Sequence, residues 1–178
     1  MSGRRGALGR RTIMTSHVER SQFEAARAAD LTYRESAGLR YLVPLGRLLF
    51  SGIFIMSLLS HFKPQLVAHA AQHGVPMANI LVPLSGILAG LGGLSILLGF
   101  RARIGAWMIV AFLVPVTLMM HAFWNETDPM ITQMQMANFI KNLSLLGGAL
   151  LIAYFGSGPI SLDSRLPSAL RRPVDRVV

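Results

Sequence analysis

A short polar face at the start of the last apolar segment has residue types that can bind a ligand. Asn138, Lys141 and Asn142 follow an i, i+3, i+4 spacing, so they share one face of a helix. A lysine and two carboxamides are costly beside lipid tails, and we therefore expect them to point into protein or a wet cavity. Ammonium and amide N–H groups donate hydrogen bonds, for example to carbonyl oxygens. This face predicts a small-molecule site.

Further polar side chains fall at the ends of other apolar segments. His61 closes the first segment, His121 closes the third, and Gln135 precedes the polar face of the last. In an up-and-down helical bundle these ends lie at one level and converge on one cavity. A quinone headgroup accepts hydrogen bonds at two carbonyl oxygens, and a histidine that titrates near neutral pH can relay protons to it.

The site hypothesis assigns each of these residues a role. We expect His121 and Lys141 to act in catalysis. The expected cofactor is a quinone. The residues expected to bind it are His61, Gln135, Asn138 and Asn142. The competing interpretation is that the same groups cap helices and anchor them at the membrane interface. Whether the protein is an enzyme is left open by the sequence.

Other candidates carry weaker signals. His69 and His73 stand at i and i+4, a spacing at which two histidines can share a metal, but no carboxylate lies in the same loop, so a solvated amphipathic helix is the better interpretation. His61 and His121 allow a bis-histidine haem as a further alternative. Five methionines near the same ends can line a lipid-accessible pocket: Met119, Met120, Met130, Met134 and Met136.

Four apolar segments must position these side chains. The 178 residues are 52% hydrophobic and only 14% charged, against about 25% charged in an ordinary soluble domain. Runs of about 20 apolar residues match the roughly 30 Å hydrocarbon core of a bilayer. The sequence predicts an all-α fold, an antiparallel bundle of four transmembrane helices forming a membrane domain at 41–156, with spans at about 41–60, 78–100, 104–123 and 136–156.

The flanking segments are basic. Residues 1–40 are an Arg-rich N-terminal segment, expected to be partly disordered or a surface helix, and Met14 is an alternative start to Met1. Residues 157–178 form a basic tail. Fifteen of the 17 Lys and Arg residues fall on one side of the predicted bundle, which places both termini in the cytoplasm and predicts a multi-pass protein of a bacterial inner membrane. Arg47, inside the first span, is expected to snorkel to that surface.

Composition also bounds the partners. The net charge of +9 gathers at segment ends, which indicates membrane topology rather than nucleic-acid binding. The sequence contains no cysteine, which excludes a thiolate nucleophile and iron–sulfur ligation within it. The expected partners are the lipid bilayer, a redox partner protein and a second copy of the chain. The second copy would pack on the GxxxG pair Gly86 and Gly90 to form a homo-oligomer.

The last span and its surroundings resemble the DoxX family of small four-helix membrane proteins. The resemblance covers about residues 42–166 and rests on QMQMANFIKNLSLLGGALLIAYFGSGPISLD, HFKPQLVAHAAQHGVPM, LGGLSILLGFRARIGAW and the His-Ala-Phe-Trp end of the third span. It implies an accessory or subunit of a membrane redox system linked to quinone. Many such relatives have a glutamate where this chain has Ala89, so a role for that carboxylate does not carry over. The alternative is a non-enzymatic membrane scaffold or small-solute carrier.

Overall fold

The computed structural model describes residues 38–166 and four residues before them, at positions 21, 22, 24 and 27. The chain divides into two units, Met1–Tyr41 and Leu42–Val178, and every element named below lies in the second. The expected Arg-rich segment at 1–40 and the end of the tail fall largely outside the described residues. In the part of the chain that is described, all regular structure is helical, which confirms the predicted fold class.

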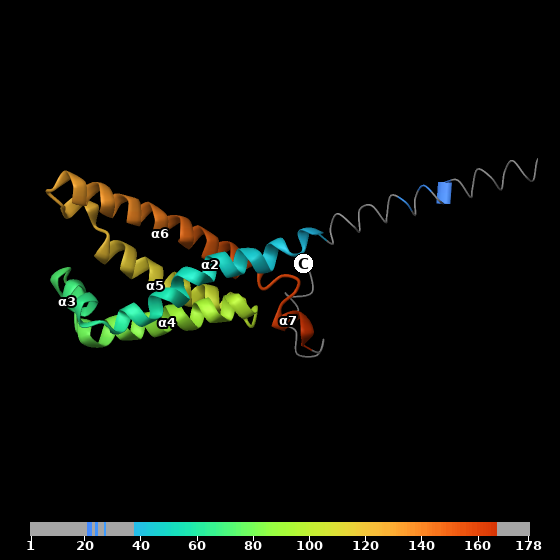
Figure 1. Ribbon diagram of the computed structural model, residues 1–178, viewed down its shortest axis with the longest axis horizontal. Helices are drawn as coiled ribbons and strands as arrows, with labels where there is room; N and C mark the ends of the chain where they lie inside the picture. Colours follow the sequence, from blue (N-terminus) through green and yellow to red (C-terminus); the bar gives the residue numbers. More distant parts are fainter. Residues whose placement is uncertain (1–20, 23, 25–26, 28–37, 167–178) are drawn as a thin grey trace, which may run out of the picture. The chain divides into compact units, whose positions relative to one another are not determined.

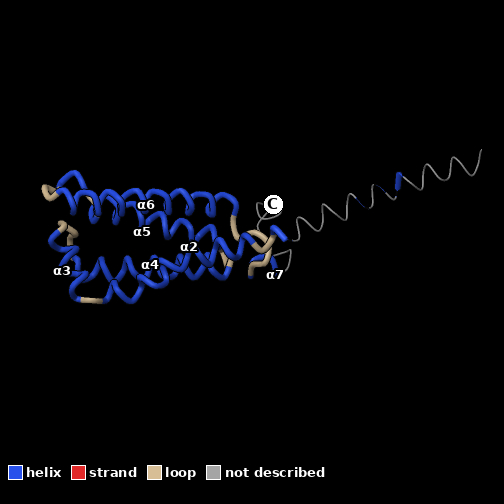
Figure 2. Tube along the Cα trace, turned by 45° about the horizontal axis from the view of Figure 1, so that its top comes forward, coloured by secondary structure: helices blue, strands red, loops and turns tan. Residues whose placement is uncertain are grey.

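Four long helices form the bundle, and each is long and apolar enough to cross a membrane. They run antiparallel to their neighbours in the chain (Figure 2). The four are α2 (Leu42–Leu58), continued by the 3₁₀ turn η1 (Leu59–Phe62), α4 (Ala78–Leu98), α5 (Ala102–Met120) and α6 (Pro129–Phe155). The expected location of both termini in the cytoplasm stays a prediction.

The last helix begins at Pro129, before the start expected near residue 136. Asp128 caps it, because its Oδ1 accepts hydrogen bonds from the backbone N–H groups of Met130 and Ile131 at 2.8 and 3.0 Å. Proline directly after such a cap suits the first helical position, where its missing N–H is not needed. The polar stretch after Asp128 therefore belongs to α6 and brings Gln135 into the helix.

Shorter elements mark the two ends of the bundle. One end, here called the α3 end, holds η1, helix α3 (Pro64–Gln72) and the 3₁₀ turn η2 (Phe123–Asn125) (Figure 1). The opposite end, the α7 end, holds the tight α4–α5 turn and helix α7 (Leu162–Arg165). All the histidines and amides of the predicted site lie in the α3 half of the bundle. The helices alternate in direction, so the ends of the first and third and the start of the fourth meet there.

Glycines let α4 pack closely on both neighbours. A Cβ at Gly86 would collide with the His61 side chain, and one at Gly90 would lie 3.0 Å from Leu58. On the other side of α4, a Cβ at Gly92 would lie 2.9 Å from the backbone oxygen of Gly105 on α5. The Gly86 and Gly90 surface is therefore covered by α2 and η1 of the same chain and is not free for the expected oligomer contact. Oligomerisation itself stays a prediction.

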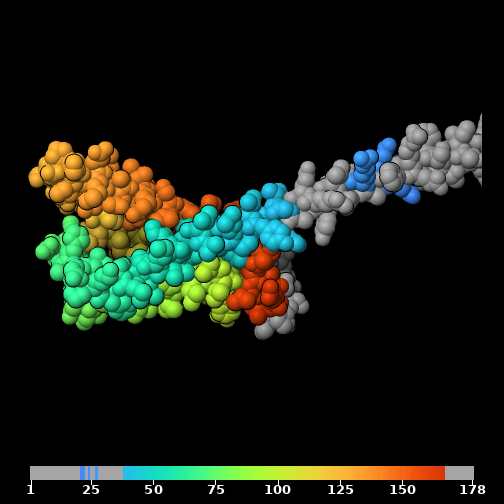
Figure 3. All heavy atoms as spheres, in the orientation of Figure 1, coloured from blue at the N-terminus to red at the C-terminus, as the bar shows by residue number. Residues whose placement is uncertain are grey.

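The bundle is open between its first and last helices. Extensive packing joins α2 to α4, α4 to α5 and α5 to α6 in the described part of the chain. Helix α6 approaches α2 toward the α7 end, where a Cβ at Gly148 would lie 3.0 Å from the Phe50 ring. Toward the α3 end the two helices diverge, and the surface is hollowed between them with α5 behind (Figure 3). This hollow faces sideways, where lipid surrounds a membrane helix.

At the α7 end, Arg47 binds the C-terminal segment instead of snorkelling. Its side chain is only 5% exposed, and its Nη1 and Nη2 groups donate to the carbonyl oxygens of Ser157 and Ile160, both at 2.6 Å. The backbone N–H of Arg101 in turn donates to both carboxylate oxygens of Asp163, at 3.1 and 2.9 Å, and the Ser157 hydroxyl donates to one of them. This cluster, the Arg47 clasp, folds the beginning of the expected tail onto the bundle, because charged donors gain more from fixed carbonyls than from a lipid surface.

Candidate ligand-binding site

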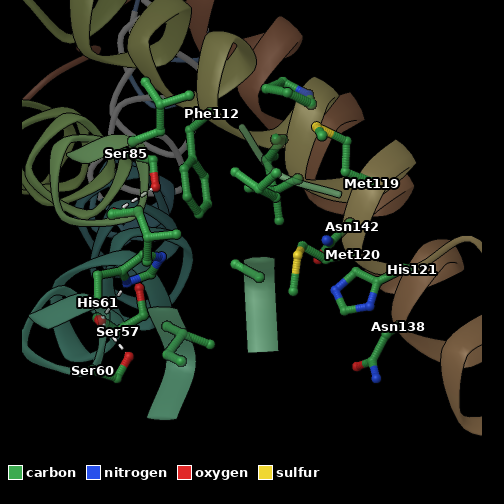
Figure 4. Close-up of a pocket in the computed structure, with 18 of the residues that line it drawn as sticks. Ser57, Ser60, His61, Ser85, Phe112, Met119, Met120, His121, Asn138 and Asn142 are labelled. Carbon is green, nitrogen blue, oxygen red and sulfur yellow. Dashed lines mark hydrogen bonds between the residues drawn. The ribbon is translucent and has the colours of Figure 1, made fainter. Parts of the chain in front are cut away.

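A cavity of about 800 Å³ opens in the α3 half of the bundle. Side chains from α2, η1, α3, α4, α5 and α6 line it, and they include exposed residues of α2 and α6 on either side of the hollow, such as Ile53 and Met134. Its volume falls in the range that small-molecule pockets occupy, about 300–1,000 Å³. Two polar walls face each other across an apolar floor (Figure 4).

The first polar wall, the α6 wall, comprises His121, Gln135, Asn138, Lys141 and Asn142. The Lys141 ammonium donates to Asn138 Oδ1 at 2.9 Å, and His121 Nδ1 lies 2.8 Å from Gln135 Oε1. Asn142 is only 6% exposed, and its carboxamide has no hydrogen-bond partner among the described residues. Its amide oxygen and nitrogen are not among the fully buried unpartnered atoms of the described residues, so they reach the cavity and can bind a polar ligand.

The second polar wall, the α2–α4 wall, comprises Ser57, Ser60, His61 and Ser85. The hydroxyls of Ser57, Ser60 and Ser85 each donate to the backbone carbonyl three residues earlier, at 3.0, 2.5 and 2.8 Å. His61 Nδ1 lies 2.8 Å from the Ser57 carbonyl oxygen, and its ring packs edge-on against Phe112 at 5.7 Å between centroids. These bonds hold the wall rigid, because every side chain in it is tied to backbone.

The floor between the walls is apolar and comes largely from α5. Phe112 is buried there, and Met119 and Met120 lie between the two walls (Figure 4). Pro115 cannot donate to the carbonyl of Ala111, and both residues line the cavity. Flexible thioethers and an aromatic ring suit a planar or irregular apolar ligand.

The structure places all six predicted site residues on this one cavity: His61, His121, Gln135, Asn138, Lys141 and Asn142. Lys141 is exposed, whereas Gln135 and Asn142 are buried. Of the five methionines, Met119, Met120 and Met134 line the cavity. The roles assigned to these residues remain predictions.

The histidines of α3 play a lesser part in the geometry. His69 lines the cavity from its rim, and its ring stacks edge-on with that of His73 at 4.5 Å between centroids. Among residues that the structure describes, no group of three His, Asp or Glu side chains is placed to hold a metal ion. The weak metal hypothesis for this pair therefore gains no support.

Sequence reasoning missed Ser85 as a site residue. It directly precedes Gly86 of the GxxxG pair, which predicts helix packing, and nothing in that stretch of sequence indicates a polar wall. Ser57 and His61 stand four residues apart on the first span, a spacing that already predicts that they share a face. The signal that joins Ser85 to them is absent from the sequence, because it depends on the pairing of α4 with α2.

Comparison with known proteins identifies the family. Residues 37–166 match the SURF4 family, which is most of the chain. The protein belongs to the SURF4 family. It is 31% identical over 99 residues to the inner membrane protein YphA of Escherichia coli strain K12, covering 56% of this chain and 70% of that protein. It is 34% identical over 93 residues to the inner membrane protein YqjF of the same strain, covering 52% of this chain and 65% of that protein. No solved structure matches the chain.

The SURF4 match overturns the resemblance to the DoxX family, which was wrong. Most of the segments that suggested DoxX are apolar helices, tight turns and small-residue packing, which recur in small multi-pass membrane proteins of several families. Ala89, the position of the missing glutamate, is fully buried in the main core. The structure and the family match support an integral membrane protein with four helices that can span the membrane. The redox role rested on the DoxX resemblance, and that resemblance no longer supports it.

Proposed function

We propose that this protein binds a lipid-soluble molecule with a compact polar head, of the quinone type, in the cavity between α2 and α6. The observation that carries the proposal is Asn142, a largely buried residue on the wall of an apolar cavity whose carboxamide reaches that cavity and has no partner among the described residues. The hollow beside it opens on the side of the bundle between α2 and α6 (Figure 3), where the lipid of a membrane would lie, so a membrane-dissolved ligand could enter without crossing water. Its head would meet the polar walls while its tail follows the apolar floor.

The setting of this site is part of the proposal. The names of YphA and YqjF place those two proteins in an inner membrane, and we propose the same membrane for this chain, with both termini in the cytoplasm. A quinone-linked redox role would need a partner protein or a bound cofactor to supply or accept electrons, because the sequence contains no cysteine to do so. The chain would then be an accessory that holds the ligand for that partner.

The test replaces Asn142 by leucine, which has nearly the same size but no amide. The full-length protein is purified in a mild detergent, and lipid-soluble molecules are extracted and identified by mass spectrometry. We expect a quinone-type molecule with wild-type protein and at least about tenfold less with Asn142→Leu, since losing hydrogen bonds worth about 1.4 kcal/mol lowers affinity tenfold.

A matched control makes that result specific. Asn125 lies in η2, is exposed and does not line the cavity, so Asn125→Leu should retain the wild-type amount of ligand. Thermal unfolding gives a second readout: Asn142→Leu should be about as stable as wild type, because leucine has nearly the same size and the amide that it replaces has no hydrogen bond within the described residues. Equal ligand content in wild type and Asn142→Leu would contradict the proposed function.

A further inference from the structure

The two walls of the cavity differ in which hydrogen-bonding groups they leave available. On the α2–α4 wall, each serine hydroxyl already spends its only proton on a backbone carbonyl. The three serines line the cavity (Figure 4), and only the lone pairs of their hydroxyl oxygens remain available to a ligand there. None of these serines can therefore donate to a ligand without breaking an existing bond.

The tautomer of His61 follows from the same chemistry. Its Nδ1 lies 2.8 Å from the Ser57 carbonyl oxygen, and a carbonyl oxygen only accepts hydrogen bonds. Nδ1 must therefore carry the proton, which leaves Nε2 of the neutral ring as an acceptor. With His61 neutral, all four side chains of the α2–α4 wall present acceptors to the cavity.

The α6 wall is different because it presents donors. Lys141 has only donors, and the amide nitrogens of Asn138 and Gln135 stay available, since the oxygens of both amides are engaged by Lys141 and His121. Asn142 can both donate and accept, and His121, whose Nδ1 donates to Gln135 Oε1, leaves an acceptor at Nε2 of the neutral ring. A ligand group that faces this wall can be a carbonyl or a hydroxyl.

We infer that, resting on the proposed function, the site takes the hydroxyl-bearing reduced form of a quinone-type ring, a quinol, in preference to the oxidised quinone. A quinol hydroxyl donates to His61 on one wall, and its second hydroxyl accepts from the α6 wall on the other. An oxidised ring has two carbonyls, and the one that faces the α2–α4 wall meets only acceptors. No proton lies between that carbonyl oxygen and the acceptors of the wall, so the carbonyl loses its water without gaining a hydrogen bond. This raises the free energy of the bound quinone.

The experiment compares the two forms of one molecule. Decylubiquinone and its chemically reduced quinol are titrated anaerobically by calorimetry into the full-length protein in lipid nanodiscs, with empty nanodiscs as the blank. We expect the quinol to bind about tenfold tighter, the factor that about 1.4 kcal/mol gives. Equal affinity, or tighter binding of the quinone, overturns this inference and leaves the proposed function standing. Binding of neither form overturns both.

Two variants of His61 provide the control. The amide of asparagine sits at the position of Nδ1, so His61→Asn keeps the bond to Ser57 but lacks the acceptor at Nε2. The amide of glutamine reaches the position of Nε2, so His61→Gln can restore that acceptor. We expect the quinol preference to vanish in His61→Asn and to return in part in His61→Gln. An undiminished preference in His61→Asn would show that another group selects the ligand.

Discussion

Arg47 is the single residue whose loss should weaken the α7 end most. It donates to two carbonyls of the C-terminal segment, Ser157 and Ile160, from a buried position. Replacing it by methionine keeps an unbranched apolar stem but removes the guanidinium, which leaves both carbonyls without their charged donor. Hydrogen bonds to charged groups contribute about 1.5–3 kcal/mol each, so Arg47→Met should lower the free energy of unfolding by about 3 kcal/mol.

Denaturant titration of the purified protein measures this change. Arg47→Lys should fall between wild type and Arg47→Met, because a lysine has one nitrogen and cannot span two carbonyls as a guanidinium does. Lys63, an exposed residue at the start of α3, provides the matched control. Lys63→Met should stay within about 0.5 kcal/mol of wild type, and an equal loss in both methionine variants would contradict a specific role for the clasp.

At the same scale, sequence reasoning identified the polar residues of the site but not their hydrogen bonds. Asn138, Lys141 and Asn142 share a helical face whatever the rest of the chain does, because the spacing alone fixes that. The same spacing does not show that Lys141 is exposed while Asn142 is buried. That difference depends on the direction from which α5 covers α6.

Among the helices, α4 and α6 carry glycines with opposite roles. Gly86 on α4 lies against His61, whereas Gly147 on α6 has open space where a Cβ would be. Alanine is favoured over glycine inside a helix by about 1 kcal/mol. Gly147→Ala should therefore stabilise the protein by roughly 0.5–1 kcal/mol, while Gly86→Ala should destabilise it by about 1–3 kcal/mol, because its new methyl group must displace the His61 side chain.

Thermal unfolding in detergent separates these two substitutions. Gly86→Ala should also reduce ligand content, because His61 belongs to the cavity wall, and Gly147→Ala should not. Stabilisation by both substitutions would mean that α4 and α2 are not packed as closely as the structure has them. The GxxxG pattern predicted a close helix contact correctly, yet it could not identify the partner as α2 of the same chain.

The start of α6 shows how a boundary is decided. Residues 125–132 are polar and lie between the third and fourth expected spans, but Asp128 followed by Pro129 starts the helix there. A hydropathy pattern marks where a helix meets lipid and not where its hydrogen bonds begin. The capping residues carried that information, and it is the local signal that the expectation at 136 did not use.

For the molecule as a whole, membrane orientation is the open prediction, and the absence of cysteine from the sequence makes it easy to test. Gln72 is exposed in α3 at one end of the bundle, and Phe100 is exposed in the α4–α5 turn at the other. Single Gln72→Cys and Phe100→Cys variants are treated with a membrane-impermeant maleimide in intact spheroplasts. With both termini in the cytoplasm, Gln72→Cys should label at once and Phe100→Cys only after lysis. The reverse pattern would contradict the predicted orientation.

The sequence by itself determined the membrane class, the four apolar helices and the polar face of the last one. These follow from composition and helical spacing, which are local properties of the chain. The family was not determined in this way, because the apolar patterns that suggested DoxX are common to many small membrane proteins, and the match to SURF4 corrected it.

Only the tertiary structure decided that α2 and α6 diverge to leave a cavity, that Ser85 joins His61 on one wall, and that Arg47 closes the opposite end through a bond to Ser157, 110 residues away in the chain. Such pairings depend on how side chains of distant elements fit together. The sequence around a glycine does not show which helix will pack against it, and the sequence around a carbonyl does not show which guanidinium will reach it. Both contacts exist only once the chain has folded.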